Sequence, residues 1–222
     1  MNILDIVGPV MVGPSSSHTA GAARIGQTTA KLLGEKVAKA NIFLHGSFLA
    51  TGEGTRYGPG AGGRAFWGWR WTIRGFRRAL RRQKKAGMEF SIQGISLQNA
   101  HPNSVKLEVT GVSGRKLEVI GASIGGGRIR ISEIDGLTAN FSGEAPTLVV
   151  YNQDRPGCIV KVTSRLGEAG INIGTMQVYR DARGGQAVMV IEVDQEVPYE
   201  QIAELEKEDG IEKVIYLCLE ER

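Results

Sequence analysis

The last third of the chain carries an alternation of short apolar segments and turn residues that restricts it to one small fold. Between Thr147 and Arg222 the apolar spacing predicts, in order, a strand, a helix, two strands, a helix and a strand. Gly170 and Gly210 follow the two helical segments at the position where a left-handed residue commonly ends a helix. This βαββαβ order predicts a ferredoxin-like four-stranded antiparallel sheet with both helices on one face.

The residues before this segment predict a separate domain of the α+β class. Apolar residues recur at helical spacing between Ser15 and Leu33, and two apolar segments, 37–49 and 90–97, are typical of strands. Alternating apolar residues on both sides of the turn at 111–114 predict a hairpin and hence an antiparallel sheet. The polar stretch 138–146 contains Gly143 and Pro146, so we expect two domains, residues 1–143 and 147–222.

The excess of basic residues comes from one segment. The net charge is +4, yet residues 54–88 contain ten Arg or Lys and no Asp or Glu, so the rest of the chain is acidic. Arginines interleaved with tryptophans in residues 64–82 favour one alternative, a nucleic-acid-binding protein, because arginine contacts phosphates and aromatic rings stack on bases. Because the basicity is local, we expect no nucleic-acid partner; a salt-dependent shift of labelled RNA or DNA would support the alternative.

Within this basic segment, residues 54–83 are anomalous in composition. Of residues 54–82, 22 of 29 are Gly, Ala, Arg, Pro or Trp, which is what GC-rich codons give when they are read out of frame. We interpret it as a frameshifted translation that packs poorly and that deprives the chain, as printed, of enzymatic activity. The alternative is a genuine Arg-rich loop, and resequencing the gene decides between them. All three tryptophans of the protein lie inside the segment: Trp67, Trp69 and Trp71.

Cysteine content and hydropathy set further limits. Cys158 and Cys218 lie far apart without metal-ligand spacing, so we expect a reduced, buried pair and no metal site in this chain. The first fourteen residues contain Asp5 in place of a basic leader region, and no segment approaches the roughly 20 apolar residues of a membrane span. We therefore expect a cytoplasmic protein that does not enter a membrane.

The string GPSSSHTAG at residues 13–21 carries the clearest chemical signal. It opens a predicted helix, whose first amides and partial positive charge suit a carboxylate, and its hydroxyl groups add donors at the same place. His18 at this end could exchange a proton as a general acid or base. The alternative is an ordinary helix cap followed by a surface histidine.

A second string, NQDRPG at residues 152–157, precedes a predicted helix, and Asn172 precedes the following strand. The pattern resembles the ACT domain, the regulatory module of enzymes of amino-acid metabolism, over all of residues 147–222. In that family the ligand lies between two modules, which implies association of two copies of this chain. The effector contacts that the resemblance implies are Asn152, Asp154, Gly157, Asn172 and Ile173. The alternative is that Asp154 and Gly157 only shape a turn and cap a helix.

Three strings, GPSSSHTAG, LHGSFLATG at residues 44–52 and HPNS at residues 101–104, precede this module. In this order they resemble the beta subunit of the iron-sulfur-dependent bacterial L-serine dehydratase. The resemblance implies conversion of L-serine to pyruvate and ammonia together with a separate alpha subunit that holds a [4Fe-4S] cluster. L-Serine or another amino acid would be substrate and effector, and this chain would ligate no part of the cluster.

The resemblance also assigns site residues. It implies a loop that binds the substrate carboxylate and, around it, residues that line or support the site; His101 is expected to fix a turn. The family has Gly-His-Gly-Thr-Asp after the Thr-Gly pair, whereas this chain has Glu53-Gly54-Thr55-Arg56-Tyr57. The alternative function is a non-catalytic, allosteric subunit that binds an amino acid. The implied residues are Ser15, Ser16, Ser17, His18 and Thr19 in the loop, with His45, Thr51 and Asn103 around it.

Overall fold

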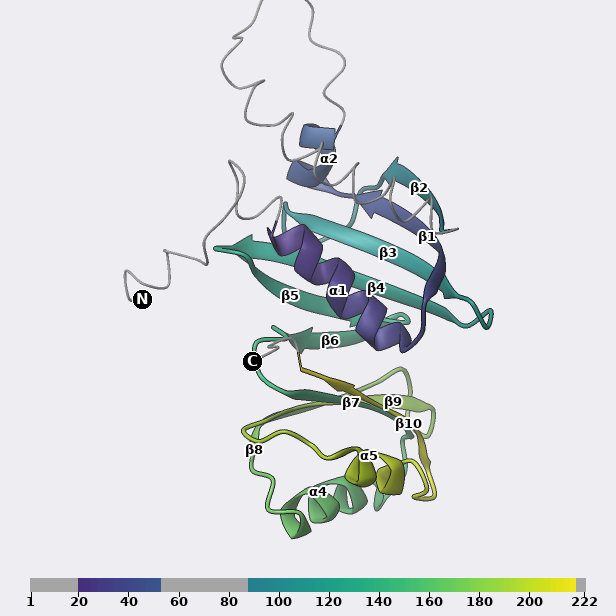
Figure 1. Ribbon diagram of the computed structural model, residues 1–222, viewed down its shortest axis with the longest axis vertical. Helices are drawn as coiled ribbons and strands as arrows, with labels where there is room; N and C mark the ends of the chain where they lie inside the picture. Colours follow the sequence, from purple (N-terminus) through teal and green to yellow (C-terminus); the bar gives the residue numbers. More distant parts are fainter. Residues whose placement is uncertain (1–19, 53–87, 219–222) are drawn as a thin grey trace, which may run out of the picture. The chain divides into compact units, whose positions relative to one another are not determined.

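The computed structural model describes residues 20–52 and 88–218, and the chain divides into two compact units, Met1–Arg130 and Ile131–Arg222 (Figure 1). The hydroxyl-rich loop Ser15–Thr19 and the anomalous segment 54–83 lie outside the described residues. The interpretation of that segment as a frameshift therefore stays a prediction. No helix in the part of the chain that is described has the length and apolar character needed to cross a membrane.

A six-stranded sheet begins in the first unit, with the strand order β2-β1-β3-β4-β5-β6. Helix α1 (Ala22–Leu33) crosses one face of this sheet, and a short helix, α2 (Gly46–Gly52), follows the first strand (Figure 1). The predicted α+β class is confirmed. The strands are β1 (Val37–Leu44), β2 (Glu89–Gly94), β3 (Ser104–Gly111), β4 (Lys116–Gly125), β5 (Arg128–Ile134) and β6 (Leu137–Phe141).

The pairing within this sheet is antiparallel apart from the pair of β1 and β2. The predicted hairpin is present, since β3 and β4 pair antiparallel from Thr110 opposite Lys116 to Ser104 opposite Ala122. β1 pairs antiparallel with β3 but parallel with β2. A parallel pair requires a long crossover connection. The intervening residues 45–88 supply that length, so the predicted antiparallel sheet has one parallel pair at its edge.

Two other predictions for this region were wrong in detail. The strand expected over residues 37–49 ends at Leu44, because Gly46 adopts a positive φ of 54° and the Ser47 amide bonds to the Pro102 carbonyl (2.7 Å), which turns the chain into α2. The strand expected over residues 90–97 ends at Gly94.

Helix α1 is amphipathic and buries one face against β3 and β4. Ile25, Leu32 and Leu33 are fully buried there. After the last residue of the helix, Gly34 adopts a left-handed conformation. The Arg115 guanidinium donates to the Leu33 carbonyl (2.5 Å) and the Leu32 carbonyl (3.2 Å). These bonds satisfy carbonyls that the helix leaves without partners, so Arg115 fixes where α1 ends.

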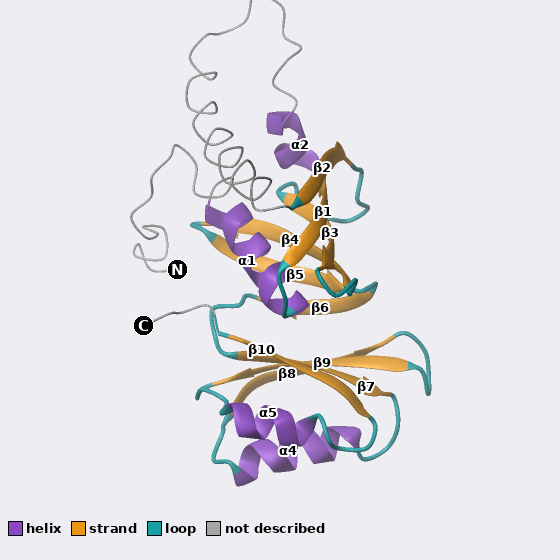
Figure 2. Ribbon diagram, turned by 45° about the vertical axis from the view of Figure 1, so that its right-hand side comes forward, coloured by secondary structure: helices purple, strands orange, loops and turns teal. Residues whose placement is uncertain are grey.

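The second sheet has the strand order β10-β7-β9-β8, with antiparallel pairing throughout. Both helices lie on one face of it (Figure 2). The predicted ferredoxin-like βαββαβ fold is therefore confirmed. Its elements are β7 (Thr147–Gln153), α4 (Cys158–Glu168), β8 (Ile173–Arg180), β9 (Gln186–Val193), α5 (Tyr199–Leu205) and β10 (Ile211–Leu217).

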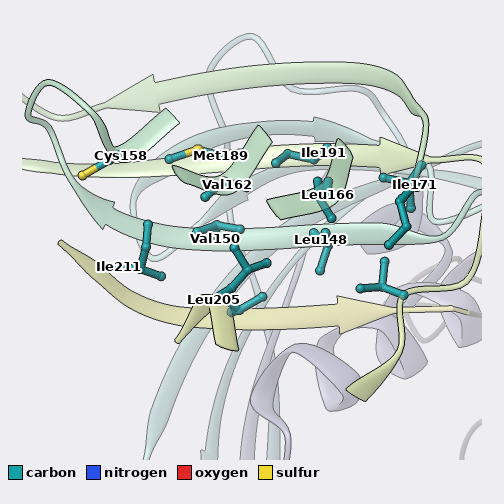
Figure 3. Close-up of a cluster of buried hydrophobic side chains, with 13 residues drawn as sticks. Leu148, Val150, Cys158, Val162, Leu166, Ile171, Met189, Ile191, Leu205 and Ile211 are labelled. Atoms are coloured by element: carbon teal, nitrogen blue, oxygen red, sulfur yellow. The ribbon is translucent and has the colours of Figure 1, made fainter. Parts of the chain in front are cut away.

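The core of this module lies between the sheet and its two helices. Val162 and Leu166 of α4 and Leu205 of α5 pack against Met189 and Ile191 of the central strand β9 (Figure 3). These side chains are fully buried. The glycines predicted to end the helices, Gly170 and Gly210, have positive φ values of 69° and 88°. The same apolar spacing that predicted the elements thus also builds the core.

Candidate functional site

Two of the strings singled out in the sequence lie against each other in the first unit. The His45 amide donates to the Ser104 carbonyl (3.1 Å), and the Ser47 amide donates to the Pro102 carbonyl (2.7 Å). A Cβ on Gly46 would lie 2.5 Å from the Pro102 oxygen, so the contact requires glycine. The loop after β1 and the loop before β3 therefore form one structural unit.

The ring of His45 is oriented by the backbone that follows β2. The Leu97 amide donates to His45 Nδ1 (3.2 Å), and the Ile95 carbonyl oxygen lies 3.4 Å from the same nitrogen. The shorter contact, with the Leu97 amide, favours the neutral tautomer that carries its proton on Nε2. The ring is half-buried. Because the Nδ1 lone pair already accepts a hydrogen bond, His45 can present Nε2–H to a ligand as a donor, but in this tautomer it offers no lone pair to remove a proton.

Asn103 connects this loop to strand β4. Its carbonyl accepts a hydrogen bond from the Ser123 amide (3.0 Å), and its side chain is half-buried. The amide of Asn103 donates to His101 Nδ1 (3.1 Å), and the His101 carbonyl accepts from the Ser104 hydroxyl (2.6 Å). These bonds confirm that His101 fixes a turn.

The start of α1 reaches the same region through Gly21, the last residue of the hydroxyl-rich string. A Cβ added to Gly21 would lie 2.0 Å from Ser123 Oγ, so the helix packs directly on β4 there. Ser123 is fully buried, and its hydroxyl has no hydrogen-bond partner among the described residues. Sequence reasoning missed Ser123; the only signal was a serine at the end of an apolar strand.

The structure thus brings together His45, Asn103 and the start of α1. Thr51 lies in α2, but the position of its side chain is not described. The loop residues predicted to bind the carboxylate lie outside the described residues, and they include His18, for which proton transfer is predicted. These residues are Ser15, Ser16, Ser17, His18 and Thr19.

In the second unit, Asp154 fastens the loop after β7 to the β8–β9 turn. Its carboxylate accepts hydrogen bonds from the Gly184 amide (3.0 Å) and the Arg180 guanidinium (3.1 Å). The Gly184 hydrogen bond, with the Arg180 guanidinium, holds the pKa of the Asp154 carboxyl below its usual range. Asp154 therefore has a structural role in the module, whether or not it also contacts an effector.

Asn152 and Gly157 lie at the same end of the module. Asn152 is buried, and its side-chain nitrogen donates to the Gln153 carbonyl (2.7 Å). In the part of the chain that the structure describes, its side-chain oxygen has no partner. Gly157 precedes α4 with a positive φ of 94°, and apart from its chain neighbours no atom of the described residues lies within 4 Å of the position a Cβ would take. The backbone at the start of α4 is therefore open to close approach.

The other two effector candidates lie at the opposite end of this sheet. Asn172 donates to Asp194 (2.6 Å), and Ile173 pairs with Val193 at the start of β8. Asp154 instead contacts Arg180, the last residue of β8, and a strand of this length spans about 23 Å. One small ligand cannot contact both ends of one module, so the predicted site requires residues from two modules.

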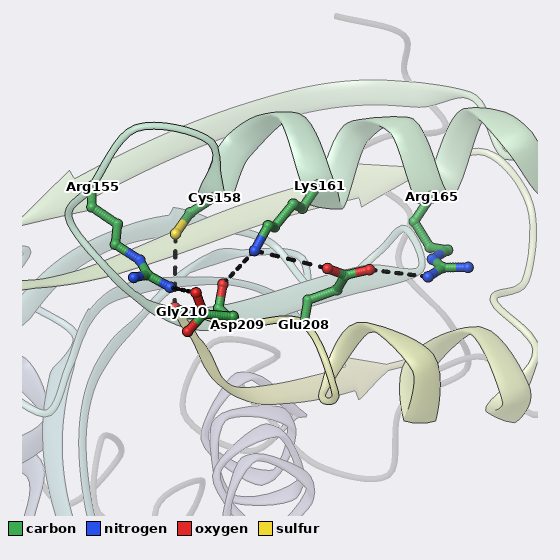
Figure 4. Close-up of polar contacts among 7 residues, drawn as sticks. All are labelled: Arg155, Cys158, Lys161, Arg165, Glu208, Asp209 and Gly210. Atoms are coloured by element: carbon green, nitrogen blue, oxygen red, sulfur yellow. Dashed lines mark hydrogen bonds and ion pairs between the residues drawn. The ribbon is translucent and has the colours of Figure 1, made fainter.

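The loop that contains the candidate effector residues is tied to the last part of the module by a row of polar contacts (Figure 4). Arg155 forms an ion pair with Asp209, and Lys161 donates to the Asp209 carbonyl (2.7 Å). Further along α4, Arg165 forms an ion pair with Glu208 (3.0 Å). These contacts link the 154–157 loop and α4 to the segment between α5 and β10.

The two cysteines are not joined in a disulfide bond. Cys158 is buried at the start of α4, near Gly210, whereas Cys218 is half-buried and follows β10 at the opposite end of that strand. The expectation that both are buried was therefore wrong for Cys218. Among the described residues, no group of three or more His, Cys, Asp or Glu is arranged to hold a metal ion.

Comparisons with known proteins agree with this architecture. Residues 147–210 match the family model described as the ACT domain. The chain is 37% identical to a probable L-serine dehydratase beta chain of Bacillus subtilis (strain 168) over 215 residues, 96% of each chain. It is 33% identical to the L-serine dehydratase beta chain of Peptoniphilus asaccharolyticus over 200 residues, 86% of each. It is also 31% identical, over 128 residues, to a D-3-phosphoglycerate dehydrogenase of Methanocaldococcus jannaschii, which is 58% of this chain and 24% of that one. The chain belongs to the family of L-serine dehydratase beta chains and carries an ACT domain at its C-terminal end.

Proposed function

We propose that this chain, together with an alpha subunit that bears a [4Fe-4S] cluster, converts L-serine to pyruvate and ammonia. The observation that carries the proposal is the convergence of His45, Asn103 and the start of α1 in the first unit. The relationship to L-serine dehydratase beta chains over nearly the whole chain supports it. An active-site role requires such a convergence, because the three strings are far apart in sequence.

In this proposal the chain supplies binding groups and the partner supplies the cluster. The loop Ser15–Thr19 contributes hydrogen-bond donors to the substrate carboxylate, and the Nε2–H of His45 orients a substrate oxygen. A cluster needs several thiolates, whereas the two cysteines here lie at opposite ends of one module. When bound in the alpha subunit, the cluster would act as a Lewis acid on the substrate hydroxyl.

A second candidate function, a purely allosteric subunit that binds an amino acid, is favoured by one comparison. The match to D-3-phosphoglycerate dehydrogenase covers 128 residues and is therefore longer than residues 147–222. It must therefore include part of the first unit. A dehydrogenase and a dehydratase catalyse different reactions, so the part they share fits ligand binding better than chemistry.

The proposed effector site lies between two copies of the ACT domain. Asp154 from one copy and Asn172 from another would contact one amino acid, because the two residues lie at opposite ends within a copy. Calorimetry with L-serine on the wild-type chain and on Asn172→Ala tests this site. We expect weaker binding in the variant; equal affinity would place the effector elsewhere.

The dehydratase function and the purely allosteric function can be distinguished in an enzyme that is reconstituted with the alpha subunit. The chain is tested as printed and with residues 55–83 in the restored reading frame, because the frameshift hypothesis predicts activity only for the second form. In the active form, His45→Gln should lower kcat/KM for L-serine. His101→Gln is the matched control, because it alters an exposed histidine that fixes a turn.

Variants of the loop Ser15–Thr19 give a second way to distinguish the catalytic function from the allosteric one. If the chain takes part in catalysis, Ser16→Ala and His18→Ala lower turnover at saturating L-serine. If the variants change only the serine concentration that activates the enzyme, the allosteric function is correct.

A further inference from the structure

Two polar side chains of the first unit are neighbours across the β3–β4 ladder. Ser104 pairs with Ala122, and the hydrogen bond from the Ser123 amide to the Asn103 carbonyl extends the ladder by one pair. Asn103 therefore lies directly opposite Ser123. Side chains of directly opposed residues point to the same face, with Cβ atoms about 5 Å apart. That face is the one on which α1 begins, because Gly21 packs on Ser123.

Neither side chain forms a hydrogen bond with another residue in the part of the chain that is described. Ser123 is fully buried with an unpaired hydroxyl, and no side-chain hydrogen bond joins Asn103 to another described residue. A buried hydroxyl without a partner destabilises the fold, and an alanine would fill the same space without that cost. Packing alone therefore does not account for a serine at position 123.

We propose that Ser123 is a substrate-binding residue, whose hydroxyl binds the carboxylate of an amino acid together with the side-chain amide of Asn103. The inference rests on the proposed function and takes L-serine as the ligand. A carboxylate accepts hydrogen bonds, and the serine hydroxyl and asparagine NH₂ are both donors. Asn103 is half-buried and reachable from solvent, whereas Gly21 covers Ser123. Binding therefore moves the start of α1 aside.

The experiment is a titration of the ¹⁵N-labelled full chain with L-serine, followed by amide chemical shifts. We expect the amides of Gly21, Asn103 and Ser123 to shift together with one dissociation constant. Ser123→Ala should weaken that binding at least about tenfold, because a hydrogen bond to a charged group is lost. The variant should melt at the same or a higher temperature than the wild-type chain, since it loses an unpaired buried group.

Thr28→Val is the matched control. Thr28 is the other fully buried residue with an unpaired hydroxyl in this helix–sheet pair, and it lies seven residues from Gly21 along α1, about 10 Å away. Its removal should affect melting in the same direction and leave L-serine binding unchanged. Unmoved Asn103 and Ser123 amides, or equal affinity in Ser123→Ala and wild type, would overturn the proposal.

This result is independent of the test of the dehydratase function. Binding at Ser123 by a chain that remains inactive with its partner, even with residues 55–83 in the restored reading frame, would contradict the dehydratase function and retain the amino-acid site. Dehydratase activity without any response at Ser123 would contradict only the assignment of Ser123.

Discussion

Gly21→Ala provides the sharpest test of how α1 is seated on the sheet. Gly21 has ordinary helical angles, with φ at −61° and ψ at −46°, so the backbone itself would accept alanine. In a helix alanine is normally favoured over glycine by about 1 kcal/mol. The new Cβ, however, would lie 2.0 Å from Ser123 Oγ and 2.5 Å from Ser123 Cβ, distances that force α1 or β4 to move.

We expect this steric conflict to outweigh helix propensity. Overpacking a well-packed contact costs about 1–3 kcal/mol, so Gly21→Ala should lower the free energy of unfolding by about 2 kcal/mol. Gly26→Ala is the control in the same helix: Gly26 is exposed, and no atom lies within 4 Å of its Cβ position. That variant should raise the free energy of unfolding by up to about 1 kcal/mol.

Urea denaturation followed by far-ultraviolet circular dichroism measures both changes. Adding Ser123→Gly to Gly21→Ala should recover much of the loss, because the nearest remaining Ser123 atom is the Cα at 3.5 Å. If Gly21→Ala stabilises the chain as much as Gly26→Ala does, the described contact between α1 and β4 is incorrect.

Two further changes test other parts of the structure. Arg115→Ala removes the two hydrogen bonds to the carbonyls of Leu32 and Leu33, and should lower the free energy of unfolding by about 1–2 kcal/mol in urea denaturation; an unchanged midpoint would contradict the helix-end assignment. Because the folded-state pKa of Asp154 is lowered, its stabilising contribution is present above the ordinary carboxyl pKa of about 3.9 and is lost as the pH falls through the folded value. The protection of the Gly184 amide against exchange, relative to an unstructured amide at the same pH, should therefore fall in acid, and Asp154→Asn should remove this loss. The same loss of protection in the variant would assign it to another group.

The ACT domain was predictable element by element because its local signals agree with one another. Helical apolar spacing coincides with glycines that adopt left-handed angles after both helices, Gly170 and Gly210. The first unit lacked that agreement. Phe48 and Leu49 extend an apolar segment that fits a strand or a helix equally well, and the Ser47–Pro102 hydrogen bond between distant residues decides for the helix.

The candidate sites, too, could be predicted from the sequence only in part. The resemblance to L-serine dehydratase beta chains identified His45 and Asn103, but Ser123 depends on the register of β3 and β4 and on the packing of α1, which a local sequence pattern does not reveal. The position of Asp154 and Asn172 at opposite ends of the module follows from strand direction. Strand direction could have been derived from the predicted βαββαβ order, so this part was available from the sequence.

The formation of pyruvate from L-serine tests the central claim most directly. It is measured anaerobically, after supply of iron and sulfide, for this chain alone, for the alpha subunit alone and for the pair, with residues 55–83 in the restored reading frame. The account predicts that neither chain alone forms pyruvate and that the pair forms it in proportion to the cluster carried by the alpha subunit. Pyruvate formed by this chain alone, or an inactive pair with an intact cluster, would contradict it.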